Sequence, residues 1–171
     1  FCMCPGGYVV NSSSEAGMVA TNGMSYGKRN GVNANSALLV NVGPGDYGST
    51  HPLAGIAFQR EIENKAFVLG GNNYFAPVQL LGDFLEDKVS SEFGDVLPTY
   101  LPGTRFAKMT DLFPGYIIDT LKEALPVFDR RIKGFMTDDA ILTAPETRSS
   151  SPVRINRNDC FESSIKGIYP I

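Results

Sequence analysis

The stretch PLAGIAFQREIENKAFVLGG, residues 52–71, carries the clearest periodic signal in this sequence. One set of apolar residues recurs at the spacing of a helix: Phe58, Ile62, Ala66 and Leu69. Arg60, Glu63 and Asn64 fall on the other side, so the pattern predicts an amphipathic helix with Glu63 facing solvent. Pro52 suits the first turn of such a helix, and the paired glycines at its end supply a stop.

The segment before this helix has a different character. Residues 1–50 are rich in Val, Ser, Asn and Gly, and turn formers separate short apolar runs at 8–10, 18–20 and 37–42. Short apolar runs bounded by turn residues are typical of β-strands. We therefore expect a β-rich part over residues 1–50.

Beyond the helix, helical patterns continue and then give way to strand patterns. Residues 78–86 predict a short amphipathic helix, and a polar connection rich in Gly and Pro follows. Pro114 can open a further helix that Pro126 bends or restarts. Strand character returns in residues 138–171, at 140–143, 153–155 and 167–169. The prediction is an α+β fold in which 52–135 is mostly helical and the two chain ends, 1–50 and 138–171, form a β-rich layer.

Composition and charge exclude several classes of protein. Hydrophobic residues make up 43% and charged residues 19% of the 171 residues, which is ordinary globular usage. No apolar run approaches the roughly 20 residues of a membrane-spanning helix. The chain has 15 basic and 18 acidic residues and no dense basic stripe, which argues against nucleic acid as a partner. The chain has three cysteines, whereas a disulfide framework usually has a larger and even number. We therefore expect a reducing, cytoplasmic setting.

Residues 43–48, Gly-Pro-Gly-Asp-Tyr-Gly, match the glycine spacing of dinucleotide-binding loops. Three residues separate the last glycine from Pro52, whereas in a nucleotide site that glycine already lies in the helix. Asp46 would also set a negative charge against the phosphates. We interpret the segment as a plain turn that does not bind nucleotides.

The cysteines and the one histidine give only weak signals. Cys2 and Cys4 lie two apart and would share one face of a strand, but a zinc site needs four ligands at suitable spacing. We predict no metal site and treat both as small buried residues, with a redox role as the alternative. His51 has no nucleophile motif beside it, so we expect it near solvent at a helix start rather than acting as a general base.

A loop near the end of the chain could bind an anion. Residues 146–154 hold Thr147 directly before Arg148, and three serines lie between Arg148 and Arg154. Hydroxyl and guanidinium groups of this kind are the donors that an anionic group needs. The alternative is a surface loop with exposed arginines, in which Arg148 would contribute little to stability.

Four segments together carry a resemblance to a known family: residues 1–7, 21–26, 33–40 and 146–155. Over nearly its whole length the chain resembles the uncharacterised FAD-dependent dehydrogenases of bacteria. These dehydrogenases are similar to the wider superfamily of HI0933-like flavoproteins. In that superfamily a two-part FAD-binding domain of Rossmann type is interrupted by an insertion with strands and a small helical domain. The resemblance implies that this chain, 1–171, is one excised segment that forms the insertion, or substrate domain, of a cytoplasmic flavoprotein oxidoreductase.

The resemblance also implies which residues approach the cofactor. We expect the loops that hold Cys4, Gly6, Gly7, Asn33, Asn35, Arg148, Ser150 and Arg154 to converge near the flavin ring. Glycines permit close backbone approach, and amides and guanidinium groups can bond carbonyl edges. The FAD-phosphate loop would lie elsewhere in the parent chain, so we expect this segment alone to lack FAD and to be inactive.

The expected partners are the rest of the parent chain, which holds the FAD-binding domain, and a small-molecule substrate. A segment cut from a larger domain exposes apolar faces, so the free piece could also self-associate. Two alternatives stay open: a non-catalytic protein-interaction module and a stand-alone small-molecule binding module. The sequence does not identify catalytic residues or the substrate.

Overall fold

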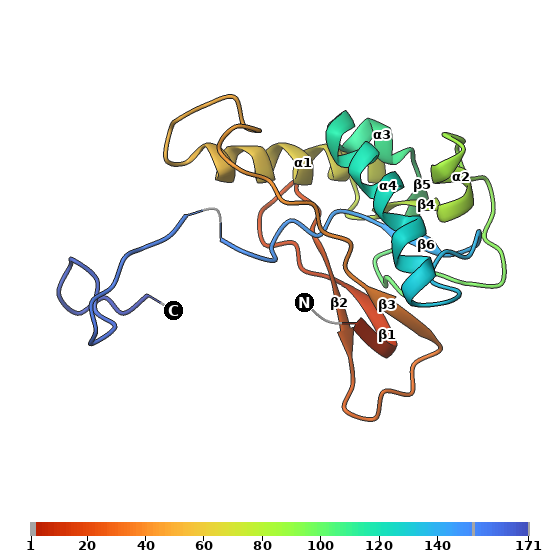
Figure 1. Cartoon of the computed structure of the whole chain (residues 1–171), viewed down its shortest axis with the longest axis horizontal. Coiled ribbons are helices and arrows are strands. Elements are labelled where there is room, and N and C mark those ends of the chain that lie inside the picture. The colour runs from red at the N-terminus through yellow and green to blue at the C-terminus, as the bar shows by residue number, and fades with distance from the viewer. Residues whose placement is uncertain (1–2, 152, 171) are drawn as a thin grey trace.

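The computed structural model describes residues 3–151 and 153–170, and its longest elements include the helix predicted from the periodic stretch. Helix α1 spans Ala54–Gly70 and crosses the upper part of the molecule (Figure 1). Gly71 ends it in the left-handed conformation, with its N–H directed to the carbonyl groups of Phe67 and Val68. A residue with a Cβ adopts this conformation less readily, which is why a glycine stops the helix here. The prediction for this helix is confirmed.

The N-terminal residues form a small antiparallel sheet, called sheet A. It contains β1 (Met3–Asn11), β2 (Thr21–Ser25) and β3 (Asn33–Ser36) in the order β2-β1-β3. The pairing of β1 with β3 shifts register between Cys4 and Gly7. The β character expected before residue 50 is confirmed, but of the three apolar runs only 8–10 lies in a strand. Residues 18–20 and 37–42 are irregular, and β2 and β3 follow and precede these runs.

Two strands of a second sheet, sheet B, lie inside the part of the chain that was expected to be mostly helical, and the third follows that part. Its central strand β4 (Ala76–Leu80) runs parallel to β5 (Thr104–Phe106) and antiparallel to β6 (Ile141–Thr143). The helix predicted over 78–86 is therefore half wrong: the chain is a strand up to Leu80 and becomes helix α2 only over Leu81–Leu85. Ala76 to Gln79 are buried on both faces of β4, so the strand lacks the alternation of apolar and polar residues that would reveal it.

Two more helices complete the body. Helix α3 spans Met109–Leu112, and α4 spans Gly115–Arg131 with Pro114 at its N-cap. Pro114 opens α4 as predicted, but Pro126 does not restart the helix, which continues to Arg131. The core is shared by the helices and by residues next to sheet B, with these buried members among others: Ile62, Ala66, Leu81, Phe84, Met109, Leu112, Ile118 and Leu125.

The α+β class is confirmed, but the two chain ends do not build one β layer. The last strand, β6, pairs with β4 in sheet B and not with sheet A. The strands expected at 153–155 and 167–169 are absent, because these residues have no neighbouring strand within the described chain and form turns and irregular structure instead. Residues after 153 extend away from the body (Figure 1). Several apolar side chains of this segment are exposed: Ile155, Phe161, Ile165, Ile168 and Tyr169.

Hydrogen bonds from distant segments fix sheet A to the rest. The N–H and the hydroxyl group of Thr21 both donate to the carbonyl oxygen of Pro145, at 2.8 and 3.0 Å. On the other side of the sheet, Val9 N–H donates to the Thr99 hydroxyl and the Asn33 amide donates to the carbonyl of Leu97. The polar connection after α2 is thus hydrogen-bonded to sheet A. Among the described residues no helix combines the length and the hydrophobicity needed to span a bilayer.

Candidate functional site

A buried carboxylate on α1, that of Glu63, lies at the centre of a cluster of polar side chains. Glu63 is only 1% exposed, in contrast to the solvent-facing position that the helical pattern predicted. Two donors reach one carboxylate oxygen, Oε1: the Thr147 hydroxyl at 2.6 Å and Arg148 Nε at 3.0 Å. Arg148 Nη2 lies 2.7 Å from the other oxygen, Oε2. Such two-point pairing with a guanidinium is what makes a buried carboxylate tolerable.

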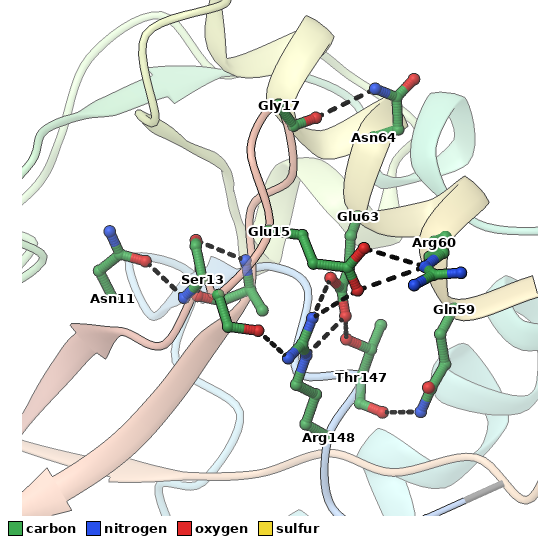
Figure 2. Close-up of polar contacts among 12 residues, drawn as sticks. Asn11, Ser13, Glu15, Gly17, Gln59, Arg60, Glu63, Asn64, Thr147 and Arg148 are labelled. Atoms are coloured by element: carbon green, nitrogen blue, oxygen red, sulfur yellow. Dashed lines mark hydrogen bonds and ion pairs between the residues drawn. The ribbon is translucent and has the colours of Figure 1, made fainter. Parts of the chain in front are cut away.

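Further polar groups extend this cluster toward solvent. Arg148 Nη1 donates to the Ser14 hydroxyl, and Nη2 lies 3.9 Å from a carboxylate oxygen of Glu15. Glu15 in turn accepts a hydrogen bond from Arg60 Nε at 3.0 Å. Figure 2 shows the Arg148 guanidinium between the Glu63 and Glu15 carboxylates, with Arg60 on the far side of Glu15. The hydrogen bond from Arg148 to Glu63 is the main cause that raises the pKa of the Arg148 guanidinium.

The cluster joins three segments that are far apart in the sequence. Ser14 and Glu15 follow β1, Glu63 belongs to α1, and Thr147 and Arg148 follow β6. Gln59, one turn before Glu63, adds a hydrogen bond from its amide to the Thr147 carbonyl at 2.6 Å. Arg148 therefore anchors a loop, and the alternative of an exposed arginine that contributes little to stability does not describe it. Glu63 directly follows the apolar residue Ile62, and this was the available signal that it lies near the buried face of α1. Helical spacing alone assigned it to the solvent face.

Two open hollows lie along α1 beside the cluster. The first has a volume of about 460 Å³ and is lined by Glu15, Ile56, Gln59, Arg60, Glu63, Arg148, Ser150 and Ser151. The second, of about 550 Å³, lies toward the start of the helix and is lined by Tyr47, Ser49, His51, Leu53, Ala54, Ile56, Ala57, Phe58, Arg60 and Glu61. Because Ile56 and Arg60 line both, we call the pair the α1 groove.

The two glycines of the Cys-Pro-Gly-Gly segment face the protein's own atoms. A Cβ on Gly6 would overlap the carbonyl group of Arg29, and Gly6 accepts a hydrogen bond from Gly31 N–H. A Cβ on Gly7 would overlap the amide of Asn35 and the carbonyl oxygen of Met24. The close approach that these glycines allow is thus made within sheet A. Their contact with a flavin stays a prediction.

The other residues expected near the flavin at this end are also engaged or buried. Cys4 is 4% exposed in β1. The Asn33 amide donates to the Leu97 carbonyl at 2.8 Å. The side-chain amide of Asn35 is buried, and within the described chain neither its nitrogen nor its oxygen has a hydrogen-bond partner. A buried amide without partners is unfavourable. Its nitrogen lies against Gly7 and its oxygen against Gly23.

The eight residues that were expected to converge near the flavin lie in separate places in the structure. Cys4, Gly6, Gly7, Asn33 and Asn35 share one end of sheet A. Arg148 bonds Ser14, beyond the other end of β1, and a strand from Cys4 to Asn11 is roughly 20 Å long. Ser150 lines the α1 groove with Arg148, whereas Arg154 is exposed in the projecting segment. Two residues named in the sequence argument, Cys2 and Pro152, lie outside the described residues.

The remaining motifs have simple explanations. Residues 44–48 form a turn that closes on itself, because Asp46 accepts the N–H of Gly43 at 2.7 Å and its own N–H donates to the Gly43 carbonyl. The first amide of the loop is therefore bonded to the loop's own carboxylate, and this negative charge is unfavourable for a phosphate. His51 is exposed near the start of α1, as expected. Within 3–151 and 153–170, no group of three or more His, Cys, Asp or Glu residues is arranged to hold a metal ion.

With this geometry in place, the chain can be compared with known proteins. A family model described as "FAD-dependent protein, C-terminal domain-like" matches residues 1–149. The chain belongs to this family, whose description associates it with FAD-dependent proteins. The match ends one residue after Arg148 and covers both sheets, all four helices and the Glu63 cluster.

An individual relative extends the comparison beyond residue 149. An uncharacterised protein from Clostridium beijerinckii is 52% identical to the chain over 171 residues. The alignment covers 99% of this chain but 32% of that protein, so the chain spans about a third of the length of this curated relative.

Proposed function

We propose that the chain is the part of a FAD-dependent oxidoreductase, a dehydrogenase, that lies over the flavin and shapes the substrate site. The family match over residues 1–149 is the observation that carries this proposal. The FAD-binding domain would be supplied by the remainder of a longer parent chain, and the substrate would be a small molecule. The parent enzyme would perform hydride transfer, the chemistry that a flavin supplies when bound.

The donor groups of the α1 groove fit this role. The hydroxyl groups of Ser150 and Ser151 line the groove together with the guanidinium groups of Arg60 and Arg148. Hydroxyl and guanidinium donors suit the carbonyl edge of a flavin or an anionic substrate group. In this proposal Arg148, Ser150 and Arg154 contact the cofactor or substrate, and the Glu63 pair holds Arg148 in position.

Sheet A fits a flavin less directly, because the spaces beside Gly6 and Gly7 contain the chain's own atoms. The Asn35 amide is the exception, since it has both a donor and an acceptor to offer. We propose that Cys4, Gly6, Gly7 and Asn33 shape this end of the sheet around Asn35, where the remainder of the parent chain packs. Exposed apolar residues at the same end of the sheet support such packing, with Tyr26 72% and Val32 97% exposed.

The first test compares the parent protein with the isolated chain. We expect the purified full-length protein to carry flavin absorbance after gel filtration. The 171-residue chain should be colourless, because in the glycine-rich loop at 43–48 the carboxylate of Asp46 accepts the Gly43 N–H and would repel a phosphate. A full-length protein without flavin would overturn the proposal, and flavin bound to the chain alone would overturn the division of roles.

A second test asks whether the arginine loop acts on the cofactor. Arg148→Ala and Arg154→Ala in the full-length protein should lower the flavin reduction potential or weaken substrate binding, because each removes a cation that would stabilise the anionic reduced flavin. Arg131→Gln, on the exposed end of α4, is the matched control. A normal potential and normal kinetics in both loop variants would remove the loop from the site.

A further inference from the structure

The half of the α1 groove nearest the helix start combines an apolar floor with aromatic walls. Leu53 is 51% exposed and lines this hollow with Ala57 on the same side of the helix. Tyr47, from the turn before the helix, stacks at a tilt on Phe58 with ring centroids 5.7 Å apart. These exposed apolar and aromatic surfaces suit a small planar or apolar body.

Two polar groups at the edge of the same hollow keep hydrogen-bond donors available. Arg60 uses only Nε in its contact with Glu15, and in the described part of the chain its two Nη atoms make no hydrogen bond or ion pair. His51 accepts the Leu53 N–H at Nδ1, at 3.1 Å. A neutral imidazole that accepts at Nδ1 has its proton on Nε2, which is then a donor.

The charges of the groove are otherwise neutralised in pairs. Glu63 is paired with Arg148, and Glu61 is paired with Lys65 at 2.7 Å. Glu15 occupies only one edge of the Arg60 guanidinium. An anionic group that meets the Nη edge of Arg60 therefore finds donors, with no unpaired carboxylate among these groups to repel it.

We propose that this half of the groove, between Tyr47 and Arg60, binds a small carboxylate that carries an aromatic ring. The ring lies against Leu53, Ala57 and the Tyr47–Phe58 pair, and the carboxylate accepts hydrogen bonds from Arg60 and His51. This inference deepens the proposed function by naming the substrate class. It rests on that function, because the ligand is a substrate only if the parent protein is the proposed enzyme. The binding itself needs no flavin.

The test is a titration of the full 171-residue chain, labelled with ¹⁵N, with benzoate and followed by NMR. Benzamide has the same ring without the charge, and acetate has the charge without the ring. We expect benzoate to shift amide resonances over residues 47–61. Benzamide and acetate should each bind at least roughly fivefold more weakly than benzoate. Equal affinity for all three probes, or shifts scattered outside these residues, would overturn the proposal.

Two variants locate the site. Arg60→Gln and His51→Gln should each weaken benzoate binding, roughly fivefold for Arg60, whereas Arg131→Gln should leave it unchanged. Arg60 and His51 are exposed, so the spectra of both variants should show a folded chain. Unchanged benzoate affinity in Arg60→Gln would overturn the inference while leaving the flavin content of the parent protein unaffected. A parent protein without flavin would overturn the proposed function but not the benzoate site.

Discussion

Nη2 of Arg148 lies 2.7 Å from Oε2 of Glu63, so a partly exposed guanidinium neutralises a carboxylate that is almost wholly buried. Arg148→Ala would leave that carboxylate with Thr147 as its remaining side-chain donor. We expect the free energy of unfolding to fall by about 2 kcal/mol, less than for a fully buried pair because the guanidinium reaches solvent. Urea unfolding of the chain measures this loss.

The matched control is Arg154→Ala, which removes an exposed arginine from the segment beyond the cluster. It should change the free energy of unfolding by less than about 0.5 kcal/mol. Equal losses in the two variants would show that the Glu63 pair does not anchor the loop. A loss in Arg148→Ala much larger than in Arg148→Lys would show that the remaining charge, and not only the two-point geometry, stabilises Glu63.

Glu146 makes stability depend on pH. Burial raises the pKa of its carboxyl group above the ordinary value of 4.5, so the folded state holds a proton that the unfolded chain has already lost. Stability therefore falls as pH rises from about 4.5 through the raised pKa, and the reduction persists at neutral pH. Glu146→Gln should be more stable than the original chain at pH 7 and similar to it at acid pH. Thermal unfolding at several pH values checks this, and a constant difference at all pH values would contradict it.

The packing of Asn35 against Gly23 can be tested by a double-mutant cycle. A Cβ on Gly23 would overlap the Asn35 amide oxygen, and its three nearest atoms, chain neighbours aside, all belong to the Asn35 side chain. Gly23→Ala should therefore destabilise the original chain by about 1–3 kcal/mol but cost much less in an Asn35→Ala background. Additive losses in urea unfolding would show that the overlap is relieved elsewhere.

Gln79 is an internal polar link in sheet B. Its side chain is buried, its Nε2 donates to the Lys88 carbonyl at 2.7 Å, and its Oε1 accepts the Met109 N–H at 2.8 Å. Gln79→Leu would leave both backbone groups without these partners, and we expect a loss of about 3 kcal/mol. Gln59→Leu, which removes one bond at a partly exposed position, should lose less than half of that in the same unfolding measurement.

Local signals in the sequence predicted those elements that local interactions define. The helix at 54–70 has an apolar stripe and a glycine stop, and α4 begins after Pro114, so both follow from nearby residues. Strand β4 could not be found in this way. Its apolar residues continue into α2 without a break, and its neighbours β5 and β6 come from far along the chain. Pairing partners at such separation leave no local pattern.

The candidate site shows the same limit. Sequence reasoning selected Arg148 from a loop rich in donors, but its partner Glu63 lies 85 residues earlier and was assigned to the solvent face. Tyr47, His51 and Arg60 were each seen as ordinary surface residues, since nothing in the sequence indicates that the turn at 44–48 folds beside the start of α1. The glycines at 6 and 7 were expected to allow close approach to the flavin. The atoms that approach them in the structure belong to the protein itself, and the flavin contact stays a prediction.

The hydrogen bonds from Thr21 to Pro145 have a consequence for how the protein is made. The two residues are 124 positions apart, so sheet A cannot reach its final anchoring until the ribosome has synthesised nearly the whole chain. At translation speeds of about 5–20 residues per second, the delay is on the order of 6–25 s. During this time Val19 and Ala20, both fully buried in the finished protein, are exposed to chaperones and proteases. A nascent chain stalled before residue 145 should therefore be cleaved near residue 20 more readily than a completed one.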